Sequence, residues 1–252
     1  MIRLERAQLP PDTAAHLKTY TDQIEQASEV DRKGTAAELW AHTTVRRRVR
    51  DGLMVTLAEM APGHQRCMYC GDSQGTDIDH FEPKSLAPLR TFEWLNHLLA
   101  CAYCNSNQKR NTFPRSEEDG SPLLLDPTLQ DPLDHLRLVL PVCTYKGLTP
   151  QGDACIAVFG LNSRGVLVDG RRTAYGTAKQ SVELWQIATE RGQHDKAAEI
   201  VQLAWNRPLA DVLAGMFHQA DHHAAALLFA GEEETLGLLR DQDLRAAFLS
   251  GA

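Results

Sequence analysis

Residues 67–85 read CMYCGDSQGTDIDHFEPKS, a stretch that combines a CxxC pair with adjacent acidic and imidazole side chains at Asp79 and His80. A second CxxC pair, Cys101 and Cys104, follows in LNHLLACAYCNSNQKRN. Each CxxC loop can direct two thiolates at one ion, and two loops together complete a tetrahedral zinc site. Because four thiolates leave no open position for water, we expect this zinc to be structural and to close the segment between the two pairs.

The bulk composition is that of an ordinary globular protein, with 252 residues, 43% apolar and 23% charged. The first residues, MIRLERAQLPPDTAAH, lack the apolar core of a secretory signal. No apolar run approaches the roughly 20 residues of a membrane span. We therefore expect a cytoplasmic protein that does not enter a membrane.

Six cysteines in a reducing compartment favour metal ligation over disulfides. A thiol-disulfide centre is a weaker interpretation, because the two CxxC pairs occur together. Cys143 and Cys155 have no such spacing, and we expect ordinary buried thiols at both positions.

The net charge of −7 is unfavourable for a nucleic-acid partner when it is taken as an average. Most of the excess acidity lies in residues 116–252, which hold eleven Lys and Arg against nineteen Asp and Glu. Residues 43–52, TTVRRRVRDG, instead gather four arginines. This run is either a solvated helix face or a patch that contacts phosphates, and the sequence leaves both interpretations open.

Apolar spacing and turn residues predict an α+β fold. Helices are expected over 11–30, over 35–60 with a capping box of Thr35 and Glu38, over about 104–111, and from about 171 to the end. A hairpin is expected around GDSQGT (71–76), with further strands in 135–140 and 154–160. The expected domains are an N-terminal helical segment (1–62), a zinc-containing core with its following strands (63–170) and a C-terminal helical region (171–252).

Four polar residues within or beside the cysteine pairs have the chemistry needed for phosphodiester hydrolysis. This reaction requires a base that activates water and a hard cation that stabilises charge on the phosphate. His80 supplies a base near neutral pH, and Asp79 and Asn105 offer oxygens that suit Mg²⁺. Asn96 lies just before the second pair, where the ordinary interpretation is a simple loop cap.

The pattern resembles the HNH (ββα-metal) nuclease family in its zinc-bound, four-cysteine form. That family has CxxC, an acidic residue and His followed by Pro, then Asn, CxxCN and a Lys. Asn105 stands in place of the second His of the family name. The matching positions lie within residues 67–109: Cys67, Cys70, Asp79, His80, Pro83, Asn96, Cys101, Cys104, Asn105 and Lys109.

The resemblance implies a role for each of these side chains. His80 would be the general base, and Asp79 and Asn105 would hold one Mg²⁺ or Mn²⁺ at the scissile phosphate. Asn96 would orient His80 through backbone hydrogen bonds in the opposite loop. Lys109 would contact a phosphate, although an exposed lysine on a helix is the ordinary alternative.

Longer stretches are similar to the HNH subunit of Septu-type anti-phage systems and to retron-associated HNH proteins. They include DIDHFEPKS, CNSNQKRNTFP and VFGLNSRGVLVDGRR. The resemblance implies a DNA-cutting effector that a partner ATPase controls. The acidic C-terminal helices would then either dock that partner or only extend the core.

The main rival class is a non-catalytic zinc module that binds nucleic acid or protein. It accounts for the cysteines but treats the placement of Asp79, His80 and Asn105 as coincidence. His97 has no assigned role. His218 and His222 are spaced i,i+4 but lack a third ligand in the sequence, so we do not expect a metal there.

Overall fold

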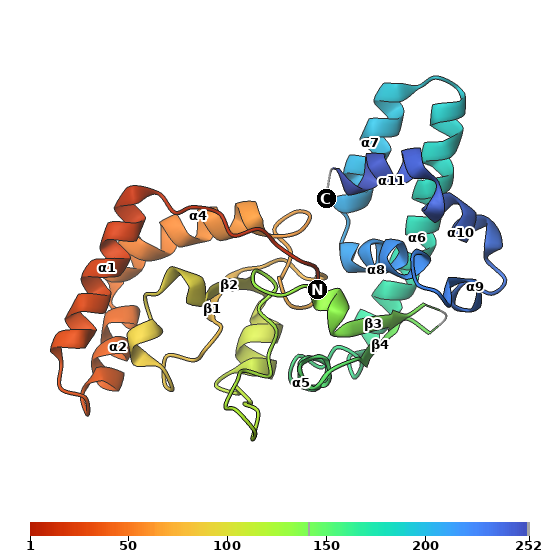
Figure 1. Ribbon diagram of the computed structural model, residues 1–252. Coiled ribbons are helices and arrows are strands. Elements are labelled where there is room, and N and C mark those ends of the chain that lie inside the picture. Colours follow the sequence, from red (N-terminus) through yellow and green to blue (C-terminus); the bar gives the residue numbers. More distant parts are fainter. Residues whose placement is uncertain (141, 251–252) are drawn as a thin grey trace.

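The computed structural model describes residues 1–140 and 142–250. Its fold is α+β, mostly helical, with two small antiparallel sheets among these residues (Figure 1). The helices α1, α2 and α4 lie on one side of the sheet formed by β1 and β2, and α6 to α11 gather at the other end of the molecule (Figure 1). One contiguous cluster of buried apolar residues runs through both ends.

The first helix, α1 (Pro11–Gln26), begins with proline at its first position, where the missing N–H costs nothing. Leu17, Tyr20 and Ile24 recur at three- and four-residue spacing and are buried. The helix ends earlier than predicted, because Ala27 takes an extended backbone conformation.

The helix predicted over 35–60 is interrupted. It begins earlier, as α2 (Arg32–Ala41), so Thr35 lies inside the helix and the predicted capping box is wrong. His42 is extended, with φ −66° and ψ 127°, and its Nδ1 accepts a hydrogen bond from the Thr44 amide at 3.3 Å. This new cap starts a second helical run of α3 (Thr43–Val45), the π-helical turn η1 (Arg46–Arg50) and α4 (Asp51–Met60).

The central sheet pairs β1 (Asp77–His80) with β2 (His97–Ala100) in antiparallel register, so His80 lies opposite His97. Residues 81–96 connect the strands and contain the short 3₁₀ turns η2 (Pro88–Arg90) and η3 (Trp94–Asn96). The predicted turn at 71–76 precedes β1 and does not join these strands. The chain reverses at 67–73 instead, and an isolated bridge between Arg66 and Gln74 closes this reversal. The helix expected after the second CxxC pair is a π-helical segment, η4 (Tyr103–Lys109).

The second sheet pairs β3 (Leu136–Val139) with β4 (Thr144–Gly147), after the short 3₁₀ turn η5 (Pro132–Asp134). The strand predicted over 154–160 is wrong, because α5 (Pro150–Val158) occupies this stretch. Thr149 caps that helix: its Oγ1 accepts a hydrogen bond from the Gly152 amide at 3.3 Å.

The remaining chain is helical. The long helix α6 begins at Gly165, within the segment predicted for the middle domain. The elements are α6 (Gly165–Glu190), α7 (His194–Trp205), α8 (Ala210–Ala220), α9 (Ala225–Leu228), α10 (Glu233–Arg240) and α11 (Gln242–Leu249).

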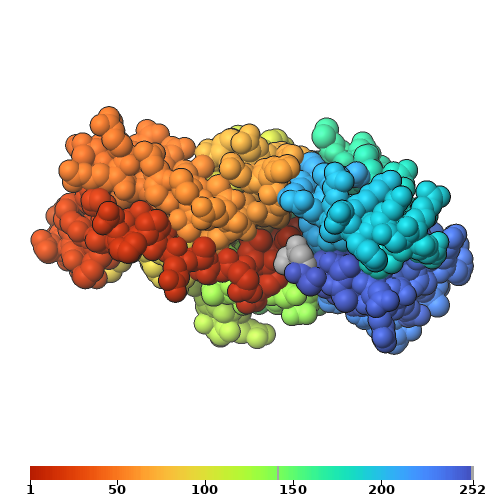
Figure 2. Space-filling model, turned by 90° about the horizontal axis from the view of Figure 1, so that it is seen from above, coloured from red at the N-terminus to blue at the C-terminus, as the bar shows by residue number. Residues whose placement is uncertain are grey.

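The first nine residues, which form no helix or strand, run along the molecule and link its two ends (Figure 2). The Met1 amine pairs with Asp211 of α8 at 2.8 Å in a buried site. Arg6 donates to the His97 carbonyl at 2.8 Å and to Thr128 Oγ1 at 2.8 Å. These contacts hold β2 and the C-terminal helices to a common segment. In the described part of the chain, we find no helix with the length and apolarity that crossing a membrane requires.

Candidate functional site

The two CxxC pairs come together as their spacing predicts. The Sγ atoms of Cys67, Cys70, Cys101 and Cys104 all lie within 4.8 Å of one another, and all four residues are buried. Tetrahedral zinc with Zn–S bonds of ~2.3 Å would set these sulfurs roughly 3.8 Å apart. Cys70 and Cys101 are separated by 4.0 Å. The group can therefore hold a metal ion such as zinc with only small adjustments.

The backbone around the cysteines favours a sulfur-bound ion. Gly71 adopts φ +69°, which lets its amide donate to the Cys67 carbonyl at 2.8 Å and closes the first loop. The Cys104 amide points at Cys101 Sγ at 3.4 Å. Arg164 donates to Cys104 Sγ at 3.5 Å, and its positive charge would offset the excess negative charge of four thiolates around one Zn²⁺.

The other two cysteines lie apart from this group. Cys143 Sγ donates to the Leu140 carbonyl, and Cys155 Sγ accepts from the Leu125 amide. Burial raises the pKa of Cys155 to about 12, so this side chain stays a thiol at neutral pH.

His80 stands at the end of β1 with only 6% of its surface exposed. Its Nε2 lies 3.1 Å from the Thr91 carbonyl, which fixes Nε2–H as a donor. Among the described residues, no group hydrogen-bonds to Nδ1. Burial, with smaller contributions from His97 and nearby cations, holds the pKa of His80 well below its usual value. His80 is therefore a neutral imidazole, with Nδ1 as the nitrogen able to take a proton.

His97 supports His80 from the neighbouring strand. It is fully buried, its Nε2 lies 3.0 Å from the same Thr91 carbonyl, and the two imidazole rings are 5.0 Å apart. Burial lowers the pKa of His97 to about 3, so it too is neutral. The Trp40 indole closes the group, with its ring centre 4.4 Å from that of His80 and 5.6 Å from that of His97.

Asn96 makes the backbone hydrogen bonds that were expected of it. Its Oδ1 accepts from the Glu82 amide at 2.8 Å, and its Nδ2 donates to the carbonyls of Glu82 and Arg90, each at 3.0 Å. The side chain is fully buried. Asn96 thus ties the start of the connecting loop, at Glu82, and its middle, at Arg90, to the residue before β2. The same loop carries Thr91, whose carbonyl orients His80.

Replacing Asn96 with alanine should destabilise the protein by about 3 kcal/mol, because buried backbone groups of Glu82 and Arg90 would lose their partners. Urea unfolding at pH 7 measures this change in the free energy of unfolding. Asn111→Ala, at an exposed position, is the matched control and should unfold almost as the unaltered chain does. Equal unfolding midpoints for the two variants would contradict the role given to Asn96.

Asp79 and Lys109 form a buried ion pair. Lys109 Nζ lies 3.1 Å from Asp79 Oδ1 and also donates to the His80 carbonyl at 2.7 Å. The Tyr69 hydroxyl donates to Asp79 Oδ2 at 2.5 Å. Burial raises the pKa of Asp79 and lowers that of Lys109, and their mutual attraction opposes both shifts.

This arrangement differs from the predicted role of Lys109. Lys109 is fully buried, so its ammonium does not face a phosphate at the surface. Each carboxylate oxygen of Asp79 accepts one hydrogen bond, Oδ1 from Lys109 and Oδ2 from Tyr69. The role of Asp79 as a cation ligand stays a prediction.

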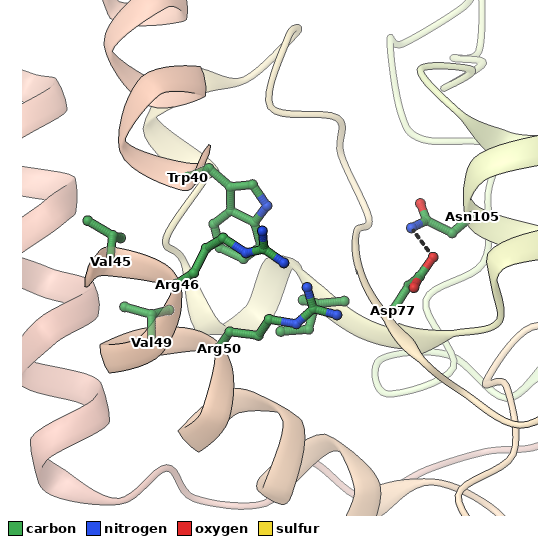
Figure 3. Close-up of a pocket in the computed structure, with 8 residues that line it drawn as sticks. Trp40, Val45, Arg46, Val49, Arg50, Asp77 and Asn105 are labelled. Atoms are coloured by element: carbon green, nitrogen blue, oxygen red, sulfur yellow. Dashed lines mark hydrogen bonds between the residues drawn. The ribbon is translucent and has the colours of Figure 1, made fainter. Parts of the chain in front are cut away.

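Asn105 contacts a different carboxylate. Its Nδ2 donates to Asp77 Oδ2 at 3.2 Å, and both residues line a pocket of about 180 Å³ (Figure 3). Asp77 and Asp79 share one face of β1 because side chains alternate along a strand. Asp77 and the Oδ1 of Asn105 are hard oxygen donors beside this pocket, and oxygen is the donor atom that Mg²⁺ and Mn²⁺ prefer.

Three contributors to the site were not predicted from the sequence: Tyr69, Trp40 and the position of Asp77 beside Asn105. Strand alternation was the available signal for Asp77. Tyr69 lies inside the first CxxC loop, so its hydroxyl links the cysteine group directly to Asp79. No sequence signal identified Trp40 as the cover of His80, because the contact joins segments forty residues apart.

Comparisons of this chain with protein-family models, curated proteins and solved structures found no match.

Proposed function

We propose that this chain is a metal-dependent nuclease that hydrolyses phosphodiester bonds. The observation that carries the proposal is the setting of His80, whose Nε2 is fixed on the Thr91 carbonyl while Nδ1 has no protein partner among the described residues. A neutral imidazole held in this way is suited to act as a general base. The same short strand carries Asp77 beside Asn105, next to the cysteine group.

In this mechanism, Nδ1 of His80 takes a proton from the attacking water, and Nε2–H remains on the Thr91 carbonyl. Thr91, His97 and Asn96 act as positioning residues, because they hold the imidazole and its acceptor. Asp77 and Asn105 would hold the divalent cation. That ion, when bound, would stabilise negative charge on the phosphate and the leaving oxygen. Zinc in the cysteine group would be structural.

The substrate and setting follow from the resemblance to anti-phage HNH proteins. The substrate is DNA, and the chain is the effector subunit of a defence system under the control of a partner ATPase. The C-terminal helical region, which carries much of the acidic excess, supplies the surface for that partner.

A non-catalytic zinc module is the second candidate. The observation that favours it is the enclosure of the site: His80 is 6% exposed and both oxygens of Asp79 are engaged. In that case, the same polar residues would only stabilise a binding domain for nucleic acid or protein.

Cleavage of supercoiled plasmid with Mg²⁺ or Mn²⁺, with and without the partner ATPase, tests the proposal. His80→Ala should reduce the rate at least about 100-fold, because it removes the base. His64→Ala, an exposed histidine, is the control and should cut normally. Zinc content and thermal unfolding of His80→Ala must match those of the unaltered chain.

Two results would overturn the proposal in different ways. If folded His80→Ala cuts as fast as the unaltered chain, His80 is not the base. If the unaltered chain cuts neither DNA nor RNA with any metal or with the partner, the non-catalytic module replaces the nuclease.

A further inference from the structure

The arginine run of residues 46–50 carries positive charge that the described protein does not neutralise. Arg46, Arg47 and Arg48 are exposed and Arg50 is half-buried. Within residues 1–140 and 142–250, no carboxylate lies within ion-pair distance of any of the four. A cluster of this kind, in a chain of net charge −7, leaves a local site for an anion.

The π-helical turn η1 separates these arginines into two pairs. Val45 and Val49 are buried and anchor the turn against the core. Arg46 and Arg50 line the pocket that Asp77 and Asn105 line from its other wall. Figure 3 shows both guanidinium groups reaching toward that wall from the same helical run. Arg47 and Arg48 do not line the pocket, although they belong to the same run.

The lining of the pocket suits a bound anion. The half-buried indole of Trp40 and the side chain of Ile78 form apolar walls. These walls shield a group that binds in the pocket from water. Arg50 Nη2 also points at the Thr76 carbonyl at 3.4 Å, just before β1. A guanidinium group beside such walls can bind two oxygens of a phosphate through paired, charge-assisted hydrogen bonds.

We infer that Arg46 and Arg50 bind a backbone phosphate of nucleic acid in this pocket, opposite Asn105. The inference rests on the proposed function, because this site would hold the phosphate that the proposed nuclease hydrolyses. Asp77 on the far wall repels a bare anion, so a divalent cation beside Asp77 and Asn105 would strengthen phosphate binding. The inference thus identifies a backbone phosphate as the bound group of the substrate and Arg46 and Arg50 as the residues that bind it.

Fluorescence anisotropy with a short fluorescein-labelled DNA duplex tests the site, using the full chain in buffer without added divalent cation. Arg46→Gln/Arg50→Gln should weaken binding at least about tenfold near 0.1 M salt and lower the slope of log K against log salt by about 2. Arg47→Gln/Arg48→Gln removes the same charge from the same turn. This matched control should lose clearly less affinity.

The assignment is overturned if the two double variants lose affinity equally, because general charge would then explain the binding. It is also overturned if neither variant changes the affinity, or if the unaltered chain does not bind the duplex. The outcome is separate from the nuclease test. If the chain never cuts DNA but Arg46→Gln/Arg50→Gln binds DNA more weakly than Arg47→Gln/Arg48→Gln, the phosphate site stands and the proposed catalysis is wrong. If the chain cuts DNA but the two double variants bind DNA equally, the catalysis stands and the phosphate site is wrong.

Discussion

Loss of the metal from the four-cysteine group should unfold the centre of the molecule. The four thiols are buried within 4.8 Å of one another, and without an ion they would have to share protons or repel as thiolates. Structural zinc sites supply apparent binding free energies of about 10–16 kcal/mol, which become folding free energy. We expect one zinc per chain by elemental analysis.

Cys104→Ser should lose this zinc and lower the unfolding temperature by at least about 10 °C. Cys155→Ser is the matched control, because Cys155 is also fully buried but lies outside the group. It should keep its zinc and melt within a few degrees of the unaltered chain. Two results together would show that the group is not a metal site. The unaltered chain would be purified without bound metal, and Cys104→Ser and Cys155→Ser would have equal unfolding temperatures.

Removing the ammonium of Lys109 should have the second large effect. Lys109→Met keeps an unbranched side chain that is one atom shorter, but it leaves the carboxylate of Asp79 buried without its counter-charge. Breaking one partner of a buried ion pair costs about 3–5 kcal/mol, because the remaining charge is uncompensated. Urea unfolding at pH 7 measures the loss in the free energy of unfolding.

A second substitution separates charge from packing. Asp79→Asn removes the orphaned charge, so the double variant Asp79→Asn/Lys109→Met should recover part of the loss, with a coupling of about 2 kcal/mol. Lys18→Met is the control, because the Lys18–Asp22 pair is exposed and contributes little. Strictly additive effects of the two core substitutions would contradict the buried pair.

The cysteine group could be predicted because CxxC spacing and sulfur chemistry leave few alternatives. The buried face of α1 could be predicted because its apolar residues recur with the helical period. The strand predicted over 154–160 failed because a short apolar run fits a strand or a helix equally well. The stronger signal was at its start, where Thr149 and Pro150 form a helix cap and first turn.

The site was only partly predictable for a related reason. Residue types and order identified His80 and Asn96, whose hydrogen bonds are local to one loop. The contact between Asp79 and Lys109 depends on how η4 packs against β1 across thirty residues, and spacing alone does not determine it. The interruption of the predicted helix at His42 could not be predicted either, because histidine is not a strong helix breaker. This interruption precedes the turn that carries the arginines.

The length of the π-helical turn η1 (Arg46–Arg50) also affects where Trp40 lies. A π turn accommodates one extra residue in a helix, and each residue turns an α-helix by about 100°. Deleting Arg47 or Arg48 would restore a regular helix, but it would rotate everything before η1 relative to α4. Trp40 would then leave the two imidazoles that it covers. We therefore expect that a change in the length of this turn would disrupt the contacts of Trp40 with His80 and His97.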